Sequence, residues 1–187
     1  MPTAVAEKED VHGLVTRAKD GDEEAMSRLI TIHKGLVYTV IYRMVNNPDT
    51  SQDLTQETFI KAFLHIKRVK NYEHFRPWLC RIARNIVYDF FRKEKRHPTV
   101  CLEDVPEMSG QDGMERTRKK LIIQDALSRL SERDRMLLTL AYYQGFTLAE
   151  AAEVLEITED NAKVALHRAR KRLRKELRGH EDELLST

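Results

Sequence analysis

The sequence contains little cysteine, little glycine and few aromatic residues, and it has no long apolar run. Its two cysteines among 187 residues, Cys80 and Cys101, fit neither a disulfide framework nor zinc spacing, so we interpret them as ordinary reduced thiols. No apolar stretch approaches the roughly 18 residues that a membrane-spanning helix needs. The first ten residues are polar and acidic and lack the apolar core of a secretory signal. These absences predict a cytoplasmic protein with no membrane insertion.

Charge is unevenly distributed, although the formal net charge is only +2. Segment 76–96 has seven Lys or Arg and segment 163–178 has eight, whereas segment 97–115 between them has five acidic residues and no Lys or Arg. The middle segment also holds proline and glycine without a helical period, which indicates a linker, with an ordered surface loop as the alternative. Two basic blocks joined by a tether are typical of two modules that act on one polyanion.

Apolar residues recur at helical spacing outside that middle segment, and no stretch alternates as a strand does. The pattern predicts an all-α fold of two small helical domains, 8–96 and 116–180, joined by a flexible linker at 97–115. Because each half has apolar stripes of its own, we expect the halves to fold separately.

Proline and capping residues set the predicted helix ends. Asn47-Pro48 stops one helix, Ser51 is expected to cap the next, and Pro77 fits the first turn of a third. The predicted helices are 8–20, 22–46, 51–70, 77–95, 116–129, 131–144, 147–155 and 158–178.

Three helices of the second half have the spacing of a helix-turn-helix unit. Thr147 and Glu150 form a predicted capping box that opens a short helix, and a tight link precedes the last helix. One face of the last helix is apolar, and the opposite face carries basic groups that suit base edges and phosphates in a major groove. The alternative is a basic helix that is merely solvated. The predicted reading face comprises Val164, His167, Arg168 and Lys171, with Lys163 and Arg174 beside it.

The helix expected from Pro77 carries an apolar stripe and a second, mixed stripe. Aromatic rings stack on bases, Arg binds phosphates and Asn pairs with base edges, so the mixed stripe suits single-stranded nucleic acid. The loop before the helix holds Tyr72 and Phe75 and would complete a pocket for an extruded base. Core packing of Phe75 and Trp78 is the alternative. The mixed stripe consists of Trp78, Arg81, Asn85, Tyr88 and Arg92.

A row at i, i+4 spacing lies on the helix expected after Ser51. Its members are Asp53, Glu57, Lys61 and His65. One interpretation is a solvated face with a weak Glu57–Lys61 pair, and the other is a docking face for a basic protein partner. The residues by themselves leave both interpretations open.

Three segments resemble motifs of the bacterial sigma-70 family. Residues 53–63, Asp-Leu-Thr-Gln-Glu-Thr-Phe-Ile-Lys-Ala-Phe, resemble region 2.2. Residues 75–85 look like the signature F-x-x-W-L-x-x-I-A-x-N of regions 2.3–2.4. Residues 145–173 are similar to region 4.2 and contain the run His-Arg-Ala-Arg at 167–170. A short linker without a third domain is typical of the extracytoplasmic-function (ECF) subgroup, and the resemblance covers about residues 10–178.

The resemblance implies a sigma factor that binds core RNA polymerase, directs it to promoters and helps to open the −10 DNA. It implies contacts of the first domain with the β′ clamp helices, the −10 element and its unpaired non-template strand. The second domain would read the −35 duplex and meet the β flap, and the linker would thread toward the active site. An anti-sigma factor is the expected negative regulator.

The resemblance also assigns roles to individual positions. The implied core polymerase-binding residues are Asp53, Gln56, Glu57 and Phe59. The implied −10 DNA-binding residues are Tyr72, Phe75, Trp78, Arg81, Asn85, Tyr88 and Arg92. The implied −35 DNA-binding residues, in the helix-turn-helix at 147–168 and just after it, are Asn161, Lys163, Val164, His167, Arg168 and Lys171.

The second half departs from the usual family pattern at the turn and in the last helix. Asn161, Val164 and Ala165 stand where Thr, Ser and Arg are usual, and Glu156 replaces a frequent Gly at the turn. These differences affect which −35 bases are read, and they leave the predicted architecture unchanged.

The sequence lacks the features expected of two other classes of protein. An ordinary helix-turn-helix repressor or activator would usually dimerise, and no heptad or dimerisation helix is evident. A helical metal-carboxylate enzyme would need a Glu-x-x-His pair within each of two facing bundle helices. The chain has this spacing only at 9–12 and 94–97, at the ends of predicted helices, which does not favour such a site. Without a Gly-rich phosphate loop or a nucleophile motif, we expect no enzymatic activity, no metal and no cofactor.

Overall fold

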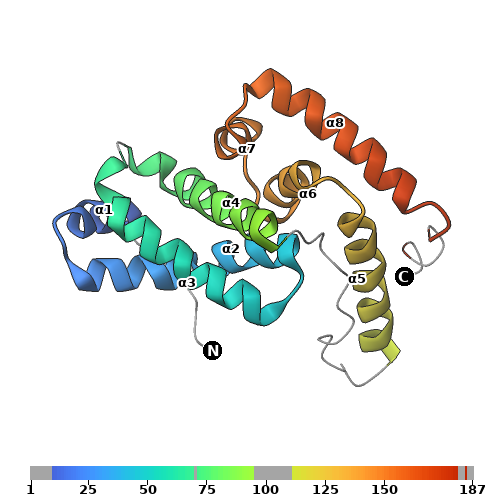
Figure 1. The fold of residues 1–187 in the computed structure, drawn as a ribbon, viewed down its shortest axis with the longest axis horizontal. Coiled ribbons are helices and arrows are strands. Elements are labelled where there is room, and N and C mark those ends of the chain that lie inside the picture. The colour runs from blue at the N-terminus through green and yellow to red at the C-terminus, as the bar shows by residue number, and fades with distance from the viewer. Residues whose placement is uncertain (1–9, 70, 95–110, 181–183, 185–187) are drawn as a thin grey trace, which may run out of the picture.

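The computed structural model describes nearly all of both predicted domains. Helices fill most of the described ranges and no strand occurs in them, which confirms the all-α prediction (Figure 1). Most of the predicted linker, residues 95–110, lies outside the described residues. The structure describes residues 10–69, 71–94, 111–180 and 184, and of these Glu94, 111–117 and Lys120 by backbone only.

Four long helices and two short 3-10 turns build the first half. The long helix α2 packs against α1, α3 and α4 (Figure 1). Helix α4 lies between α3 and the second half of the molecule, which is the placement that matters most for function. The elements are α1 (Val11–Lys19), α2 (Glu23–Val45), α3 (Pro48–His65), η1 (Ile66–Arg68), η2 (Tyr72–His74) and α4 (Phe75–Glu94).

The junction between α2 and α3 differs from the prediction in its cap. The Asn47 side chain accepts a hydrogen bond from the Thr50 N–H at 2.8 Å, and Pro48 occupies the first helical turn. Proline fits there because its missing N–H is not needed, so α3 begins directly after α2 ends. The expected cap at Ser51 is therefore wrong: Ser51 is buried inside α3 and donates to the Asn47 carbonyl oxygen at 2.6 Å.

The second half contains four α-helices and a π-helical turn. The predicted helix at 131–144 is present, but its second part is the π-turn η3, and α5 begins earlier than predicted. The capping box of Thr147 and Glu150 is confirmed, with Glu150 accepting from the Thr147 N–H at 2.7 Å. The elements are α5 (Gln111–Ser128), α6 (Glu132–Leu138), η3 (Thr139–Tyr143), α7 (Leu148–Leu155) and α8 (Glu159–Glu176).

The two halves share one hydrophobic core, and the second half has a smaller buried cluster of its own around Leu127, Leu138 and Ala169. Helix α4 packs against α7, and α2 packs against α6. The buried core continues from Leu29 and Leu79 of the first half to Met136 and Val154 of the second. We expected each half to bury its own apolar stripes, and this prediction did not include a buried surface common to both halves.

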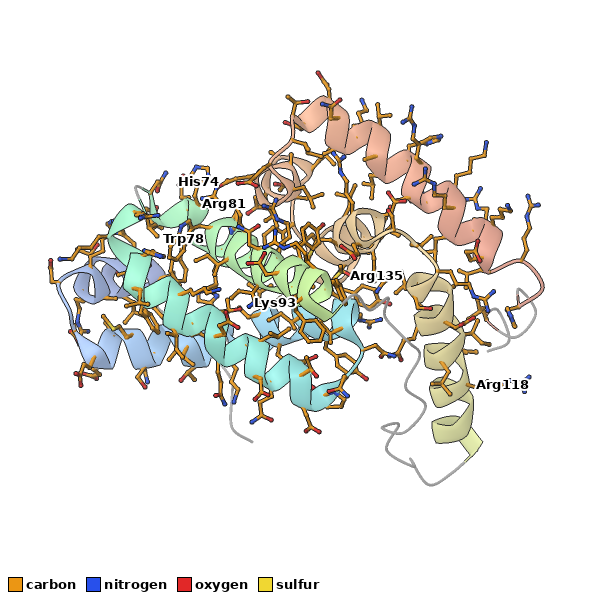
Figure 2. All side chains as sticks on the ribbon, viewed as in Figure 1. His74, Trp78, Arg81, Lys93, Arg118 and Arg135 are labelled. Carbon is orange, nitrogen blue, oxygen red and sulfur yellow. The ribbon has the colours of Figure 1, made fainter. Side chains whose placement is uncertain are left out.

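Arg135 on α6 is a buried cation at the junction of the two halves (Figure 2). Its guanidinium donates to the carbonyl oxygens of Leu127, Ser128 and Leu130 at the end of α5, and to that of Met44 near the end of α2, at 2.9–3.1 Å. Helix C-termini present unpaired carbonyl groups and partial negative charge, so a cation suits this place. Burial lowers the pKa of Arg135 to about 10, which leaves it charged at neutral pH.

Candidate nucleic-acid interface

Helix α8 is anchored on one side and open on the other. Thr158 caps it by accepting a hydrogen bond from the Asn161 N–H at 3.3 Å. Ala162 and Ala169 are completely buried against the rest of the second half, and Arg172 pairs with the buried Asp134 of α6. This anchoring confirms the predicted apolar stripe and fixes which face of α8 points outward.

All six predicted −35 residues lie exposed on α8. Val164 is 49% exposed, so an aliphatic side chain lies among the polar groups of this face. A groove of about 450 Å³ runs along this face, lined by Leu148 of α7 and by Lys163, His167 and Arg168 of α8. An exposed helix with basic groups beside an apolar contact matches the shape and chemistry of a major groove. The exposed residues are Asn161, Lys163, Val164, His167, Arg168 and Lys171.

The predicted −10 face of α4 is only partly open. Tyr72 before the helix and Asn85 and Arg92 on it are exposed, whereas Arg81 and Tyr88 are half-buried. The mixed stripe is therefore accessible along its middle and end.

Phe75 and Trp78 are core residues, which is the alternative that the sequence left open. Phe75 is 1% exposed and Trp78 is 8% exposed. Their ring centroids lie 5.8 Å apart, and the Phe75 ring also lies 5.2 Å from that of the buried His33. The two rings support the start of α4 instead of offering a face to a base in this conformation.

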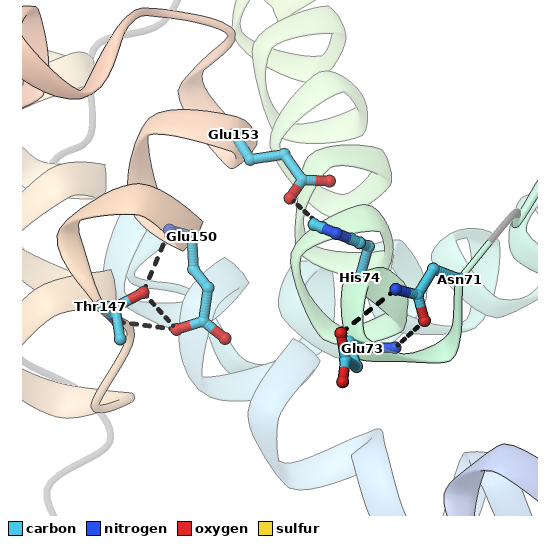
Figure 3. Close-up of polar contacts among 6 residues, drawn as sticks. All are labelled: Asn71, Glu73, His74, Thr147, Glu150 and Glu153. Carbon is cyan, nitrogen blue, oxygen red and sulfur yellow. Dashed lines mark hydrogen bonds and ion pairs between the residues drawn. The ribbon is translucent and has the colours of Figure 1, made fainter.

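The loop before α4 has a defined geometry. Asn71 accepts a hydrogen bond from the Glu73 N–H at 3.1 Å and thereby caps η2 (Figure 3). The Tyr72 ring lies 4.4 Å from the ring of His12, so α1 supports this loop from the other side. Tyr72 remains 43% exposed, as a base-stacking residue must be.

The row on α3 faces solvent, whereas Phe59, the fourth residue that the resemblance assigns to core polymerase, is buried beside it. Asp53 and Gln56 are exposed, and Glu57 pairs with Lys61 at 2.7 Å, one turn along the helix. Phe59 is only 5% exposed, but it lines a groove of about 370 Å³ between α2 and α3. The neighbouring Ile60 is 61% exposed, so apolar surface lies beside the polar row.

Side chains of the first half make polar contacts with the second half that the sequence did not reveal. His74 lies 2.7 Å from a carboxylate oxygen of Glu153 on α7 (Figure 3). The Arg76 guanidinium donates to the Gln144 carbonyl oxygen at 3.2 Å. Arg43 stacks over the Tyr143 ring, 3.7 Å from its centroid.

A third buried stripe on α4 explains why this interface exists. It consists of Cys80, Arg84, Val87 and Phe91, which follow each other at i, i+3 and i+4 spacing and are all buried. Arg84 reaches the end of α7 directly by donating to the Val154 carbonyl oxygen at 2.5 Å. This helical spacing could have predicted a third buried face of α4. It was missed because a cysteine and an arginine occupy two of the four positions, so the stripe does not look apolar.

The structure describes one of the two cysteines, Cys80. Cys80 is completely buried, and desolvation raises the pKa of its thiol to about 12. A thiol with so little thiolate is a structural residue. Cys101 lies outside the described residues.

Among the described residues, no group of three or more His, Cys, Asp or Glu side chains is placed to hold a metal ion. None of the helices within the described ranges is both long and apolar enough to cross a bilayer.

Comparison with known families identifies both halves. The family model of Sigma-70 region 2 matches residues 29–97, and that of Sigma-70, region 4 matches residues 120–173. The first match contains α3, the loop and α4, and the second contains the helix-turn-helix. Together they define a two-region protein of the sigma-70 class.

Full-length relatives narrow this class. The chain is 30% identical over 181 residues to the ECF RNA polymerase sigma factor SigW of Bacillus subtilis (strain 168), covering 88% of this chain and 95% of SigW. It is 34% identical over 144 residues to the ECF sigma factor SigM of the same organism, covering 74% of this chain and 86% of SigM. This chain belongs to the ECF sigma factors of the sigma-70 family, and its function is promoter-directed transcription initiation.

A solved structure has the same arrangement of helices. The sigma factor RpoE from Bartonella quintana, in a co-crystal with the anti-sigma factor NepR, matches with a TM-score of 0.67 at 22% identity. The match covers 82% of this chain and 96% of RpoE, which shows a common fold.

Proposed function

We propose that residues 8–96 bind core RNA polymerase and the −10 element, that 116–180 read the −35 element, and that 97–115 connect them. The single observation that supports this division best is the outward face of α8. All six −35 candidates, Asn161, Lys163, Val164, His167, Arg168 and Lys171, are exposed there while the opposite stripe is buried. A helix so oriented offers base contacts without any rearrangement of the second half.

Core polymerase binding is assigned to the exposed part of α3. Asp53, Gln56 and Glu57 present acidic and amide groups that suit a basic docking partner such as the β′ clamp helices. Phe59 contributes through the groove that it lines, since its ring is otherwise buried. The β flap is the proposed partner of the second half.

The −10 element is assigned to the exposed groups on α4 and its preceding loop. Asn85 is exposed and offers its amide N–H donors to a base edge, while Arg84 donates to its Oδ1 atom, and Tyr72 offers an exposed ring. Arg81, Tyr88 and Arg92 extend this face along the helix. Phe75 and Trp78 contribute by supporting the start of the helix.

Three further proposals follow from the same assignment. The chain acts without enzymatic chemistry of its own, because the polymerase supplies catalysis. It works in the cytoplasm, where polymerase and promoter DNA are found. An anti-sigma factor is its proposed regulator, in keeping with the NepR complex of the related fold.

The test is reconstituted transcription. The purified full chain is added to core polymerase, and run-off products are mapped on genomic DNA of the source organism. We expect new start sites preceded by a common −35 and −10 pair. Failure of the chain to bind core polymerase or to change the start sites would refute the proposal.

Single substitutions test which residues contact the −35 element. Arg168→Ala is expected to cost about 1–3 kcal/mol of binding to −35 duplex if Arg168 reads a base edge. Equal loss on random duplex would make it a phosphate contact. Arg129→Ala is the matched control, since Arg129 is exposed but pairs with Asp125 on α5.

Core docking has its own charge-matched test. Asp53→Lys with Glu57→Lys is expected to weaken binding to core polymerase without loss of helix signal. The control, Asp20→Lys with Glu24→Lys, makes the same change of charge outside the row. If both pairs bind core polymerase as the parent does, α3 is not the docking face.

Asn85→Ala tests base capture. We expect normal folding and core binding with reduced promoter opening, and incomplete rescue by a pre-melted −10 bubble, because capture itself is lost. Wild-type opening by this variant would remove Asn85 from the −10 site.

A further inference from the structure

Arg84 of α4 joins the −10 face to the helix-turn-helix. Its side chain is 7% exposed and uses all three nitrogens. Nε and Nη2 donate to the Asn85 Oδ1 atom at 3.0 and 2.6 Å, Nη1 donates to the Val154 carbonyl oxygen, and Nη2 also donates to the Glu156 carboxylate. One guanidinium therefore touches both the amide that we assign to the −10 base and the turn between α7 and α8.

Glu156 occupies a backbone position that favours glycine. Its φ and ψ are 55° and 47°, in the left-handed region, where a side chain carries a steric cost. The other turn that ends a helix nearby, at φ +64°, uses Gly145. A glutamate at such a position needs a compensating contact, and the carboxylate finds it in Arg84.

We propose that Arg84 is a contact for a phosphate of the unpaired −10 strand, and that in the free chain Glu156 occupies this contact. The inference rests on the proposed function, because it takes α4 as the −10 helix. A guanidinium binds carboxylate and phosphate oxygens with the same planar pair of donors, so one can replace the other.

If the two halves separate, Arg84 loses its partners in the second half but stays on α4 beside Asn85. Val154 and Glu156 leave with the helix-turn-helix, whereas Asn85 stays one residue away on α4. The freed donors then lie beside the amide, where a captured base and its own phosphate would be held together. The free protein is thus less able to take up single-stranded DNA than the same chain with its halves apart.

The first test measures binding of the free full chain to a fluorescent, random-sequence single-stranded oligonucleotide. Glu156→Gly removes the carboxylate and the backbone strain together, so the variant is expected to fold. We expect about three- to tenfold tighter binding than the parent. The salt dependence should steepen by about 0.7 in the logarithmic slope, as one added phosphate contact requires. Glu159→Gln, which removes a nearby negative charge that does not touch Arg84, is expected to show neither change.

The second test adds Arg84→Ala to Glu156→Gly. The gain in affinity and in salt slope should disappear, because the freed cation is gone. Retention of the gain in the double variant would show that Glu156 acts by general repulsion and would overturn the proposal. An unchanged affinity in Glu156→Gly alone would overturn it as well.

The third test uses the complex with core polymerase and a pre-melted promoter. Arg84→Ala should weaken capture of the unpaired strand in this complex. Arg84→Lys should retain part of the capture, since Lys keeps the positive charge but lacks the planar pair of donors. Parent-like capture by Arg84→Ala contradicts the phosphate contact. If the parent chain initiates transcription and Asn85→Ala impairs opening while the Arg84 variants do not, this inference fails and the proposed function stands.

Discussion

At the scale of single residues, Arg135 is a buried side chain that binds backbone groups of both halves. It satisfies four carbonyl groups, three at the end of α5 and one near the end of α2. Arg135→Met should cost about 3–5 kcal/mol of unfolding free energy, because four carbonyl groups lose a charged hydrogen-bond donor. Urea denaturation followed by circular dichroism measures this loss.

The control for Arg135 is its exposed neighbour Arg133. Arg133→Met makes the same exchange of side chains on the surface of α6, and its effect should stay within about 0.5 kcal/mol. Equal stability of the two variants would show that the carbonyl contacts contribute nothing.

His33 predicts a dependence of stability on pH. Burial, followed by the charge of Arg76, lowers the pKa of His33 to about 4 from its ordinary 6.5. Its Nε2 atom has no hydrogen-bond partner within the described part of the chain. Between these two values the unfolded chain binds the proton and the folded chain does not. Stability should therefore fall as pH falls from 6.5 to 4, by about 1–3 kcal/mol.

His33→Leu isolates that effect. The leucine keeps an apolar contact with Phe75 but cannot bind a proton, so the variant should lose less stability over the same pH range. The comparison is made by urea denaturation at several pH values. Parallel curves for the two proteins would exclude His33 as the cause.

At the scale of secondary-structure elements, the short helix α7 depends on its capping box. It has eight residues, so few internal hydrogen bonds support it. The Thr147 hydroxyl oxygen accepts from the Glu150 N–H at 3.2 Å, and Thr147→Ala should cost about 1 kcal/mol in thermal or urea denaturation. The control is Thr31→Ala in the middle of α2, where alanine is the better helix former and no loss is expected. A loss at both positions would argue against capping as the cause.

Local chemistry explains which elements were predictable from the sequence. The capping box, the stop at Asn47-Pro48 and the two faces of α8 all depend on residues within one or two turns of each other. The sequence leaves the burial of Phe75 and Trp78 open, because a stripe that mixes aromatic and polar residues fits both a core and an exposed face. The π-helical turn η3 was not predicted from the sequence.

The contacts of Arg84 and Arg135 show the limit of local patterns for the candidate site. Each side chain joins segments about 70 to 90 residues apart, and each resembles an ordinary basic surface residue in the sequence. The −35 face was predictable because α8 presents it on its own. The partly covered −10 face was not, because the second half of the chain decides its exposure.

At the scale of the whole molecule, Cys80 reports whether the halves are together. It belongs to the α4 stripe that faces the second half, and its pKa of about 12 leaves about a thousandfold less thiolate than at its ordinary 9.0. In a Cys101→Ser chain, Cys80 should react very slowly with iodoacetamide at neutral pH. Glu156→Gly should speed the reaction while the helix signal stays constant. Rapid reaction in the parent, or identical rates in the two chains, would contradict a closed free state.

The segment that joins α4 to α5 gives the interface between the halves a particular thermodynamic character. Only sixteen residues, 95–110, separate the described parts of the two halves. A short tether of this kind holds two surfaces at an effective concentration in the millimolar range, on the order of 1 mM or above. Contacts that are individually weak, such as Arg43 on Tyr143 or Arg84 with Glu156, therefore add effectively to the shared core in holding the halves together. The closed state is therefore insensitive to dilution, and the cellular amount of this protein does not set how much of it is closed. A competitor for the same surfaces can shift that balance, and its own concentration then sets the proportion of open chains.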